Sequence, residues 1–260
     1  MSTTTASTNQ QSNGAVTEVG TTVGGKSIQA YHFGDGAKEI LFVGGIHGGY
    51  EWNTTLLMNQ LIDYLQANPG AVPANVQLTI IPVLNVDGLS AVVGTSSRFT
   101  LANVSPSQDV QVAGRFNTNT VDLNRNFYCD WKPEGVWQTK TVSAGTAAFS
   151  EPETQAVKAY VAAKNPVAVV AWFSSAGGVF SSNCHNGVLP ETNALNELFA
   201  KASGYPSHEV FDYYATTGDM TNWLAKLKIP AISVLLTNHT DVEWDKNIAG
   251  IKALLQHYAQ

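Results

Sequence analysis

Short apolar runs alternate with longer segments of helical spacing along most of this chain, and this alternation limits the folds open to it. Strand-like runs lie at Ile28–Phe33, Ile40–Ile46, Gln77–Val83, Val167–Trp172 and Pro230–Thr237. Helix-like segments lie at Trp52–Gln66, Glu151–Ala163, Glu191–Ala202, Thr221–Leu227 and Val242–His257. Alternating strands and helices predict an α/β fold whose largely parallel sheet is covered by helices on both faces. We expect one domain over residues 21–260, with a mixed, twisted sheet of about eight strands.

Composition excludes two classes of partner. The chain has 260 residues and a formal net charge of −6, and 13% of its residues are charged, against about 25% in a typical soluble domain. A chain this acidic and charge-poor lacks the basic surface that nucleic-acid binding needs. Its densest apolar run, Val167–Phe173, is far shorter than the roughly 20 residues that span a bilayer. We therefore expect a soluble globular protein, a monomer, without a nucleic-acid partner or a membrane span.

The N-terminal residues and the cysteines say little about the compartment. Residues 1–20 are rich in Ser, Thr, Asn and Gln and predict a disordered tail, without the basic and apolar regions of a signal peptide. A surface this poor in charge is common in secreted proteins, so we place the natural parent outside the cell or in the cell envelope. Cys129 and Cys184 either pair or stay free, and one pair would not settle the compartment.

Two local patterns carry further expectations. Ser150 followed three residues later by Glu153 has the spacing of a capping box at the start of the helix at 151–163. Residues 94–120 are rich in Ser, Asn and Gly and predict a long loop. Loops of that length in a compact domain are usually functional.

The first candidate site follows the strand at 40–46. Ligands of open α/β sheets bind beyond the carboxyl ends of the strands. His47 comes directly after this strand, and Glu51 follows four residues later at the start of a helix. Imidazole nitrogen and carboxylate oxygen are both zinc ligands. The pair equally fits a loop histidine beside an acid that is favoured at a helix N-terminus.

A second candidate site is the pair Asn124-Arg125. An arginine offers a bidentate fork to a carboxylate, and an asparagine adds an amide donor. The pair therefore predicts a carboxylate-binding site. The alternative is an arginine paired with a structural acid of the protein itself.

Seven segments, taken together, identify a family. They are Gly45–Glu51, Asn85–Gly88, Asp122–Phe127, Ser150–Thr154, Ala171–Ser174, Thr217–Asp219 and Ile229–His239. In order and content they resemble the zinc carboxypeptidases, the funnelins typified by pancreatic carboxypeptidases A and B, over nearly all of residues 25–258. The strings Asp-Leu-Asn-Arg-Asn-Phe and Ser-Glu-Pro-Glu-Thr are specific to that family. The resemblance implies a hydrolase, a metalloprotease that removes the C-terminal residue of peptides.

The resemblance assigns roles to the metal and reaction centre. His47 and Glu51 match the first two zinc ligands, although the family spaces them His-x-x-Glu and three residues intervene here. Asp122 matches a partner of His47 that fixes the tautomer of a ligand. Arg115 matches the arginine that polarises the scissile carbonyl and stabilises the oxyanion.

The resemblance also assigns substrate contacts. Asn124 and Arg125 match the pair that holds the C-terminal carboxylate, and Tyr214 the mobile tyrosine that closes over the substrate. Thr221 falls at the floor of the family's specificity pocket. An acid there, for which Asp219 is the candidate, would favour basic side chains. We expect a broad or apolar preference instead.

Two positions depart from the family. Phe173 stands where the family has the histidine that is the third zinc ligand, and Leu235 stands where it has the glutamate that is the general base. A catalytic zinc usually has three protein ligands, and a phenylalanine has no lone pair to offer. A general base typically contributes about 10²–10⁴-fold to the rate. We therefore expect weak or absent zinc binding and hydrolysis that is abolished or strongly impaired.

Other residues offer poor substitutes for the lost groups. His185 follows Phe173 within about a dozen residues and could approach the site as a replacement ligand. The remaining candidates are expected to be surface or packing residues: His32, His208, His239 and His257.

The paired loss of ligand and base leaves two interpretations. We favour an inactivated, engineered variant of an active carboxypeptidase. The other is a natural pseudoenzyme or redesigned pocket that binds peptide C-termini, or a small apolar ligand beside Phe173 and Leu235, without hydrolysing them.

Overall fold

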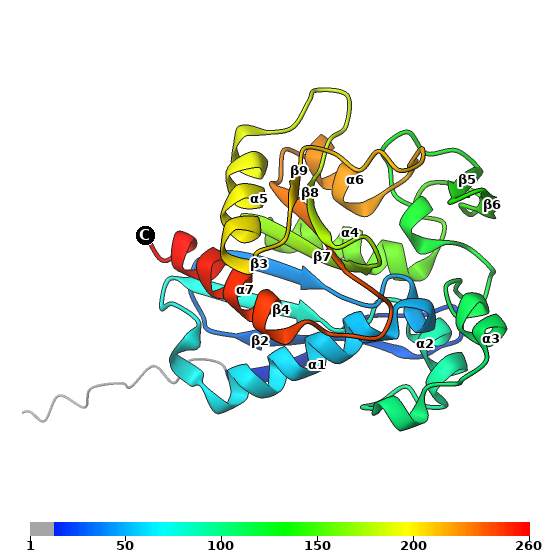
Figure 1. The fold of residues 1–260 in the computed structure, drawn as a ribbon, viewed down its shortest axis with the longest axis horizontal. Coiled ribbons are helices and arrows are strands. Elements are labelled where there is room, and N and C mark those ends of the chain that lie inside the picture. Colours follow the sequence, from blue (N-terminus) through cyan, green and yellow to red (C-terminus); the bar gives the residue numbers. More distant parts are fainter. Residues whose placement is uncertain (1–12) are drawn as a thin grey trace, which may run out of the picture.

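The computed structural model describes residues 13–260, which form a sheet covered by helices on both faces (Figure 1). The strands of the large sheet are β1 Asn13–Thr21, β2 Ser27–Phe33, β3 Lys38–Val43, β4 Val76–Ile81, β7 Ala168–Ser174, β8 Gly178–Ser181, β9 Ser207–His208 and β10 Ala231–Leu236. The remaining two strands, β5 Glu134–Trp137 and β6 Lys140–Ser143, form a separate hairpin. The α-helices are α1 Trp52–Ala67, α2 Val86–Val93, α3 Gln108–Ala113, α4 Pro152–Lys164, α5 Pro190–Ser203, α6 Met220–Lys226 and α7 Trp244–Tyr258.

The large sheet has eight strands in the order β1-β2-β4-β3-β7-β10-β8-β9. The pairs β4–β3, β3–β7, β7–β10 and β8–β9 are parallel, and the pairs β1–β2, β2–β4 and β10–β8 are antiparallel. The predicted fold class, a mixed sheet with a largely parallel centre, is therefore confirmed. The central strands are apolar throughout because both of their faces are covered, and every residue of β7 is buried.

Two apolar layers hold the helices to the sheet. On one face, side chains of α1, α5 and α7 pack around residues such as Phe42 and Trp172 of the central strands. On the other face, α4 and α6 cover alternate residues of the same strands, among them Phe173 and Leu235. Because successive strand residues point to opposite faces, Trp172 belongs to one layer and Phe173 to the other.

The carboxyl ends of the parallel strands point toward α2, α3 and the β5–β6 hairpin, on the right of Figure 1. Here β3 leads to His47 and β7 ends at Ser174. The neighbouring β10 ends at Leu236 and continues into the loop that carries His239. In register, Leu235 of β10 lies opposite Phe173 of β7. Residues far apart in the sequence are thus brought together at one edge of the sheet.

The expected N-terminal tail is wrong for its last eight residues. Residues 13–21 form β1, which pairs antiparallel with β2, for example Val16 with Tyr31. The strand is at the sheet edge and largely exposed on both faces, so its sequence lacks the apolar alternation that identifies a half-buried strand. Residues 1–12 of the expected tail lie outside the described part of the chain.

Two further local expectations are corrected. The capping box does not form: Glu151 is the N-cap residue of α4, Ser150 Oγ donates to Glu151 Oε1, and Glu153 Oε1 accepts from the backbone N–H of Val23. The loop at 94–120 contains the short helix α3.

The open question of the cysteines is answered by a Cys129–Cys184 disulfide, with Cα atoms 6.2 Å apart. It ties the segment after the Asp-Leu-Asn-Arg-Asn-Phe string to the segment before α5. Across residues 13–260, none of the helices is both long enough and apolar enough to cross a membrane.

Candidate functional site

A cavity of about 660 Å³ opens at the carboxyl ends of β3, β7 and β10. Every residue that the sequence placed in the site except Asp122 lines it: His47, Glu51, Arg115, Asn124, Arg125, Phe173, Tyr214, Thr221 and Leu235. Asp122 is fully buried directly behind them. The strand ends therefore bring the predicted residues together, as the topology requires.

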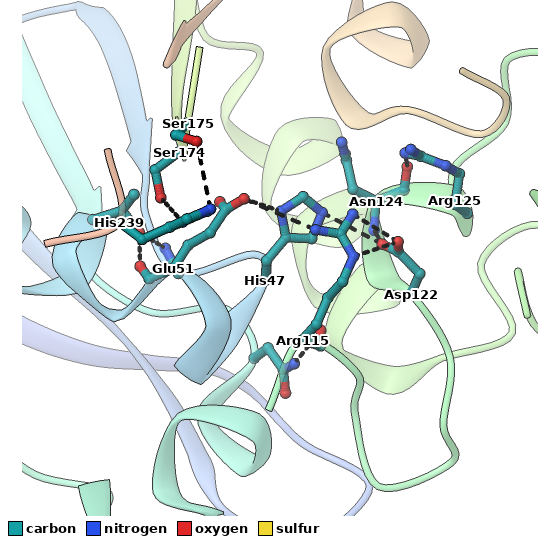
Figure 2. A network of polar contacts seen from close by, with 12 residues as sticks. His47, Glu51, Arg115, Asp122, Asn124, Arg125, Ser174, Ser175 and His239 are labelled. Carbon is teal, nitrogen blue, oxygen red and sulfur yellow. Dashed lines mark hydrogen bonds and ion pairs between the residues drawn. The ribbon is translucent and has the colours of Figure 1, made fainter. Parts of the chain in front are cut away.

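His47 lies between two carboxylates (Figure 2). Its Nδ1 is 2.8 Å from Oε1 of Glu51, and its Nε2 is 3.4 Å from Oδ1 of Asp122. Neither contact has the angles of a hydrogen bond, and Oε2 of Glu51 is buried without a partner among the described residues. His47 and Glu51 are thus two buried candidate metal ligands that face each other, with Asp122 on the far side of the imidazole.

Arg115 and Asp122 form the best-defined ion pair of the site. Nε and Nη2 of Arg115 both donate to Oδ2 of Asp122, at 3.0 and 2.8 Å. The guanidinium also stacks over Trp137 of β5, 4.4 Å from the ring centroid. Burial alone would raise the pKa of Asp122, but Arg115, Arg125 and His47 hold it far below its usual range. Asp122 is therefore a permanent negative charge that fixes Arg115.

Asn124 is held by the N-terminus of α6. Its Nδ2 donates to Oδ2 of Asp219 at 2.8 Å, and its Oδ1 accepts from the backbone N–H of Met220. The other oxygen of Asp219 accepts from Thr221 Oγ1 and from the N–H of Asn222. Both carboxylate oxygens of Asp219 therefore already accept hydrogen bonds, one from Asn124 and the other as the cap of α6. Asp219 is not a free acid at the floor of the cavity.

Arg125 is buried, with 1% of its surface exposed, yet its hydrogen bonds go to neutral groups. Nε and Nη2 donate to the carbonyl of Val136, at 3.1 and 2.9 Å, and Nη1 donates to the carbonyl of Asn124 at 2.7 Å. Those bonds use three of the five N–H groups of a guanidinium. One N–H on each terminal nitrogen has no acceptor among residues 13–260, and those two can receive one carboxylate.

The two positions at which the sequence predicts the loss of a zinc ligand and a general base are apolar and adjacent. Phe173 is 5% exposed, and its ring centroid is 5.4 Å from that of His47. Leu235 lies beside it on the next strand and lines the same cavity. A phenyl ring is therefore the neighbour of His47 on this side of the cavity.

Tyr214 lies near Arg125 in the cavity lining. Its ring centroid is 5.8 Å from the guanidinium carbon of Arg125. Burial raises the pKa of the Tyr214 phenol, so it is a neutral hydrogen-bond donor. Thr221 lines the same cavity, and its Oγ1 lies 3.2 Å from Ser233 Oγ.

A surface or packing role was expected for four histidines, and three of them have it. His32 lies between Thr17 and Thr79 in the sheet, His208 stacks on Phe180, and His257 is exposed. His185 does not approach the site as a replacement ligand: it is exposed and pairs with Asp130, 2.6 Å away, outside the cavity lining.

His239, expected to be a surface or packing residue, lines the cavity instead. Its Nδ1 lies 2.8 Å from Ser174 Oγ, and its ring packs on Tyr50, centroid to centroid 4.6 Å. Burial lowers the pKa of His239, which keeps the imidazole neutral. Residues Tyr50 and Trp137, which flank Arg115, were also missed. Tyr50 and His239 lie within the segments Gly45–Glu51 and Ile229–His239, but the resemblance assigned neither of them a role in the site, and no motif marks Trp137.

The sequence of the chain is similar to those of known proteins. The zinc carboxypeptidase family, Peptidase_M14, matches residues 3–232. Gamma-D-glutamyl-L-diamino acid endopeptidase 1 of Lysinibacillus sphaericus is 28% identical over 219 residues, which are 76% of this chain and 55% of that protein. Human carboxypeptidase D is 29% identical over 160 residues, 59% of this chain and 9% of that protein. The chain thus spans about half of the first relative and a small part of the second.

Solved structures share the fold. Carboxypeptidase A from Helicoverpa armigera superposes with a TM-score of 0.74 at 20% identity, over 95% of this chain and 69% of that one. Murein-tripeptide amidase MpaA from Escherichia coli O157 superposes with a TM-score of 0.68 at 19% identity, over 92% of this chain and 90% of that one. At these identities the likeness supports the fold alone.

Proposed function

Because the chain belongs to the zinc carboxypeptidase family, we propose that it binds the C-terminal carboxylate of peptides in the cavity beside Arg125. We propose in addition that its capacity for zinc-dependent hydrolysis of the C-terminal peptide bond is abolished or strongly impaired. The two parts rest on different ends of the cavity.

The observation that carries the first part is the buried, unpaired charge of Arg125. Its three hydrogen bonds end on backbone carbonyls, whereas Arg115 is neutralised by Asp122. A buried charge is costly unless an opposite charge accompanies it. A carboxylate that enters the cavity supplies that charge and accepts the two remaining N–H groups. Asn124, with one amide hydrogen not used by Asp219, and Tyr214 add neutral donors.

The second part rests on the donor set for zinc. His47 Nδ1 and the carboxylate of Glu51 suit zinc, and Asp122 behind His47 suits the orientation of a ligand. The next position around them is the ring of Phe173, which cannot coordinate a metal. The residues present therefore do not fit a catalytic zinc, and Leu235 cannot accept a proton from water. No hydrolytic step follows from this set of side chains.

A variant of Arg125 tests carboxylate recognition. Arg125→Met keeps the packing of the stem and removes the charge. Since hydrogen bonds to charged groups contribute about 1.5–3 kcal/mol, a peptide with a free C-terminus should bind about 10- to 100-fold more weakly. The same peptide with an amidated C-terminus should bind both proteins equally and weakly.

Titration calorimetry measures these affinities, and Arg98→Met, at an exposed arginine paired with Asp63, is the matched control. The panel includes an ordinary peptide and one ending in a γ-D-glutamyl-diamino acid unit, the linkage in the name of the Lysinibacillus relative. Equal affinity of the native protein for free and amidated peptides would refute the proposal.

A second candidate is the binding of a small apolar ligand beside Phe173 and Leu235. It is favoured by the adjacency of the two side chains in register and by their place in the cavity wall. The same titrations separate it from the first, because an apolar ligand would bind the native protein and Arg125→Met equally.

A further inference from the structure

A chain of hydrogen bonds at the far end of the cavity begins at Asn53 of α1. Its Nδ2 donates to the carbonyls of Asn238 and Asp241, at 2.8 and 3.0 Å. The opposite orientation of this amide would place its oxygen against two carbonyl oxygens. The amide hydrogens are therefore both used, and Oδ1 of Asn53 can only accept.

The next members of the chain are Ser174 and His239. Ser174 Oγ lies 3.1 Å from Oδ1 of Asn53, so the hydroxyl donates its single hydrogen there. Ser174 Oγ also lies 2.8 Å from Nδ1 of His239. Having no second hydrogen, the hydroxyl must accept this bond, and Nδ1 of His239 must carry the proton.

It follows that Nε2 of neutral His239 holds a lone pair. Among residues 13–260 its contact is the exposed hydroxyl of Ser175 at 3.5 Å, the limit of a hydrogen bond. The ring is fixed in this direction by Tyr50 on one side and by Ser174 on the other. Figure 2 shows His239 at one end of a row of polar residues and Arg125 at the other, with Glu51 and His47 between them.

We propose that Nε2 of His239 accepts a hydrogen bond from a backbone amide N–H of the bound peptide and thereby determines specificity. The inference rests on the proposed function, since Arg125 anchors the C-terminal carboxylate of that same peptide. Because Glu51 and His47 lie between His239 and Arg125 in Figure 2, a ligand that meets both has a second polar group beyond its carboxylate, and the peptide backbone supplies one. The site thus selects an amide-linked peptide over a free amino acid and over an ester-linked analogue.

The experiment compares a short free-acid peptide with analogues in which each amide in turn is replaced by an ester, which removes one N–H. One analogue should bind the native protein about five- to tenfold more weakly than the peptide, as for the loss of one neutral hydrogen bond. His239→Phe should lose the same factor with the parent peptide and nothing more with that analogue. Ser174→Ala removes the hydroxyl that fixes the tautomer of His239, so its affinity for the parent peptide should fall by a smaller factor.

The matched control is His208→Phe, the same chemical change at an imidazole outside the cavity lining, which should bind all ligands as the native protein does. Nitrogen-15 NMR of His239 in the full chain should show Nδ1 protonated and Nε2 bare. A proton found on Nε2 would overturn the role of His239 alone. So would a native protein that binds every ester analogue as tightly as the parent peptide while it still prefers the free acid to the amide. Failure to bind any peptide would overturn the proposed function together with it.

Discussion

The two ends of the cavity differ in how their polar groups are satisfied. At the Arg125 end, Arg115, Asp122, Asn124 and Asp219 are joined by buried ion pairs and hydrogen bonds. At the other end, His47 and Glu51 face each other beside a wall made by Phe173 and Leu235, and Oε2 of Glu51 has no partner in the described chain. The first end is a connected polar network in which two N–H groups of Arg125 stay available to a ligand, whereas at the second both nitrogens of His47 and Oε2 of Glu51 lack hydrogen bonds among the described residues.

The two ends are held by different parts of the fold. Asn124 is held by the N-terminus of α6, whereas Phe173 and Leu235 are neighbours on β7 and β10. Under the proposed function, binding would therefore depend on contacts that are separable from those of catalysis. Four predictions test this difference between the two ends.

The largest effect is expected from introducing a third zinc ligand and a general base beside His47 and Glu51. Phe173→His together with Leu235→Glu should bind stoichiometric zinc, measured by elemental analysis, and should hydrolyse C-terminal peptide bonds. The base alone should contribute about 10²–10⁴-fold to the rate, and the completed ligand set adds the metal.

The two single variants are the controls for this restoration, since each supplies half of what is missing. Stoichiometric zinc and turnover in the native protein would contradict the prediction, because the native residues would then suffice to bind the metal and to hydrolyse the peptide.

The second prediction concerns how much the buried charge of Asp122 contributes to the free energy of unfolding. Asp122→Asn removes a fully buried charge between Arg115 and His47. Leaving a buried arginine without its partner should lower the free energy of unfolding by about 3–5 kcal/mol, measured by denaturant titration.

Asp63→Asn provides the matched change, because Asp63 forms an exposed pair with Arg98 and should lose at most about 1 kcal/mol. Equal effects of the two variants would mean that the buried network contributes no more than a surface pair.

The third prediction compares neighbouring leucines of β10. Leu236 is 0% exposed, whereas Leu235 is 7% exposed and borders the cavity. Truncation of buried leucines to alanine costs about 2–5 kcal/mol, more where a closed void is left. Leu236→Ala should fall in the upper part of that range and Leu235→Ala at or below its lower end. The reverse order in thermal or denaturant unfolding would show that Leu235 is a core residue rather than a cavity wall.

The smallest effect is a pH dependence behind the loop that carries His239. Burial alone would raise the pKa of Glu243, but hydrogen bonds from Lys246, Tyr205 and Thr237 lower it to about 2, from 4.5. A carboxyl whose folded pKa lies below its unfolded value stabilises the protein above the unfolded pKa. That contribution should disappear as the pH falls from 4.5 toward 2.

Glu243→Gln should therefore be less stable than the native protein near neutral pH and should approach it at the acid end of this window. Unfolding free energies of the two proteins across the window measure the difference. A constant difference at all pH values would exclude the titration of Glu243 as its cause.

Much of the fold and part of the site could be predicted from the sequence. The apolar runs that became β3, β4, β7 and β10 are buried on both faces, so their composition alone identifies them. The string that contains Asp122, Asn124 and Arg125 is specific enough to predict that these three residues lie together in the site, and the family resemblance added Arg115. The roles of these residues in binding stay predictions until the variants are measured.

The missed features share a physical cause: they depend on contacts between distant segments. The strands β5, β6, β8 and β9 have two to four residues each, too few for a periodic pattern. The resemblance at Ile229–His239 assigned no site role to His239, and only the fold brings it to Ser174 and, through Ser174, to Asn53. Asp219 reads as a free acid in the sequence, yet the hydrogen bonds of Asn124 and α6 consume it.

The register of β7 and β10 has a consequence for how such a chain can change. Leu235 and Phe173 are direct neighbours across two parallel strands and belong to one apolar layer. A histidine placed at 173 alone would face a leucine, and a glutamate placed at 235 alone would face a phenyl ring. Each single step leaves a polar group next to an apolar neighbour, so the two sites should show strong epistasis. A change from the apolar to the polar pair is therefore expected to need both substitutions together.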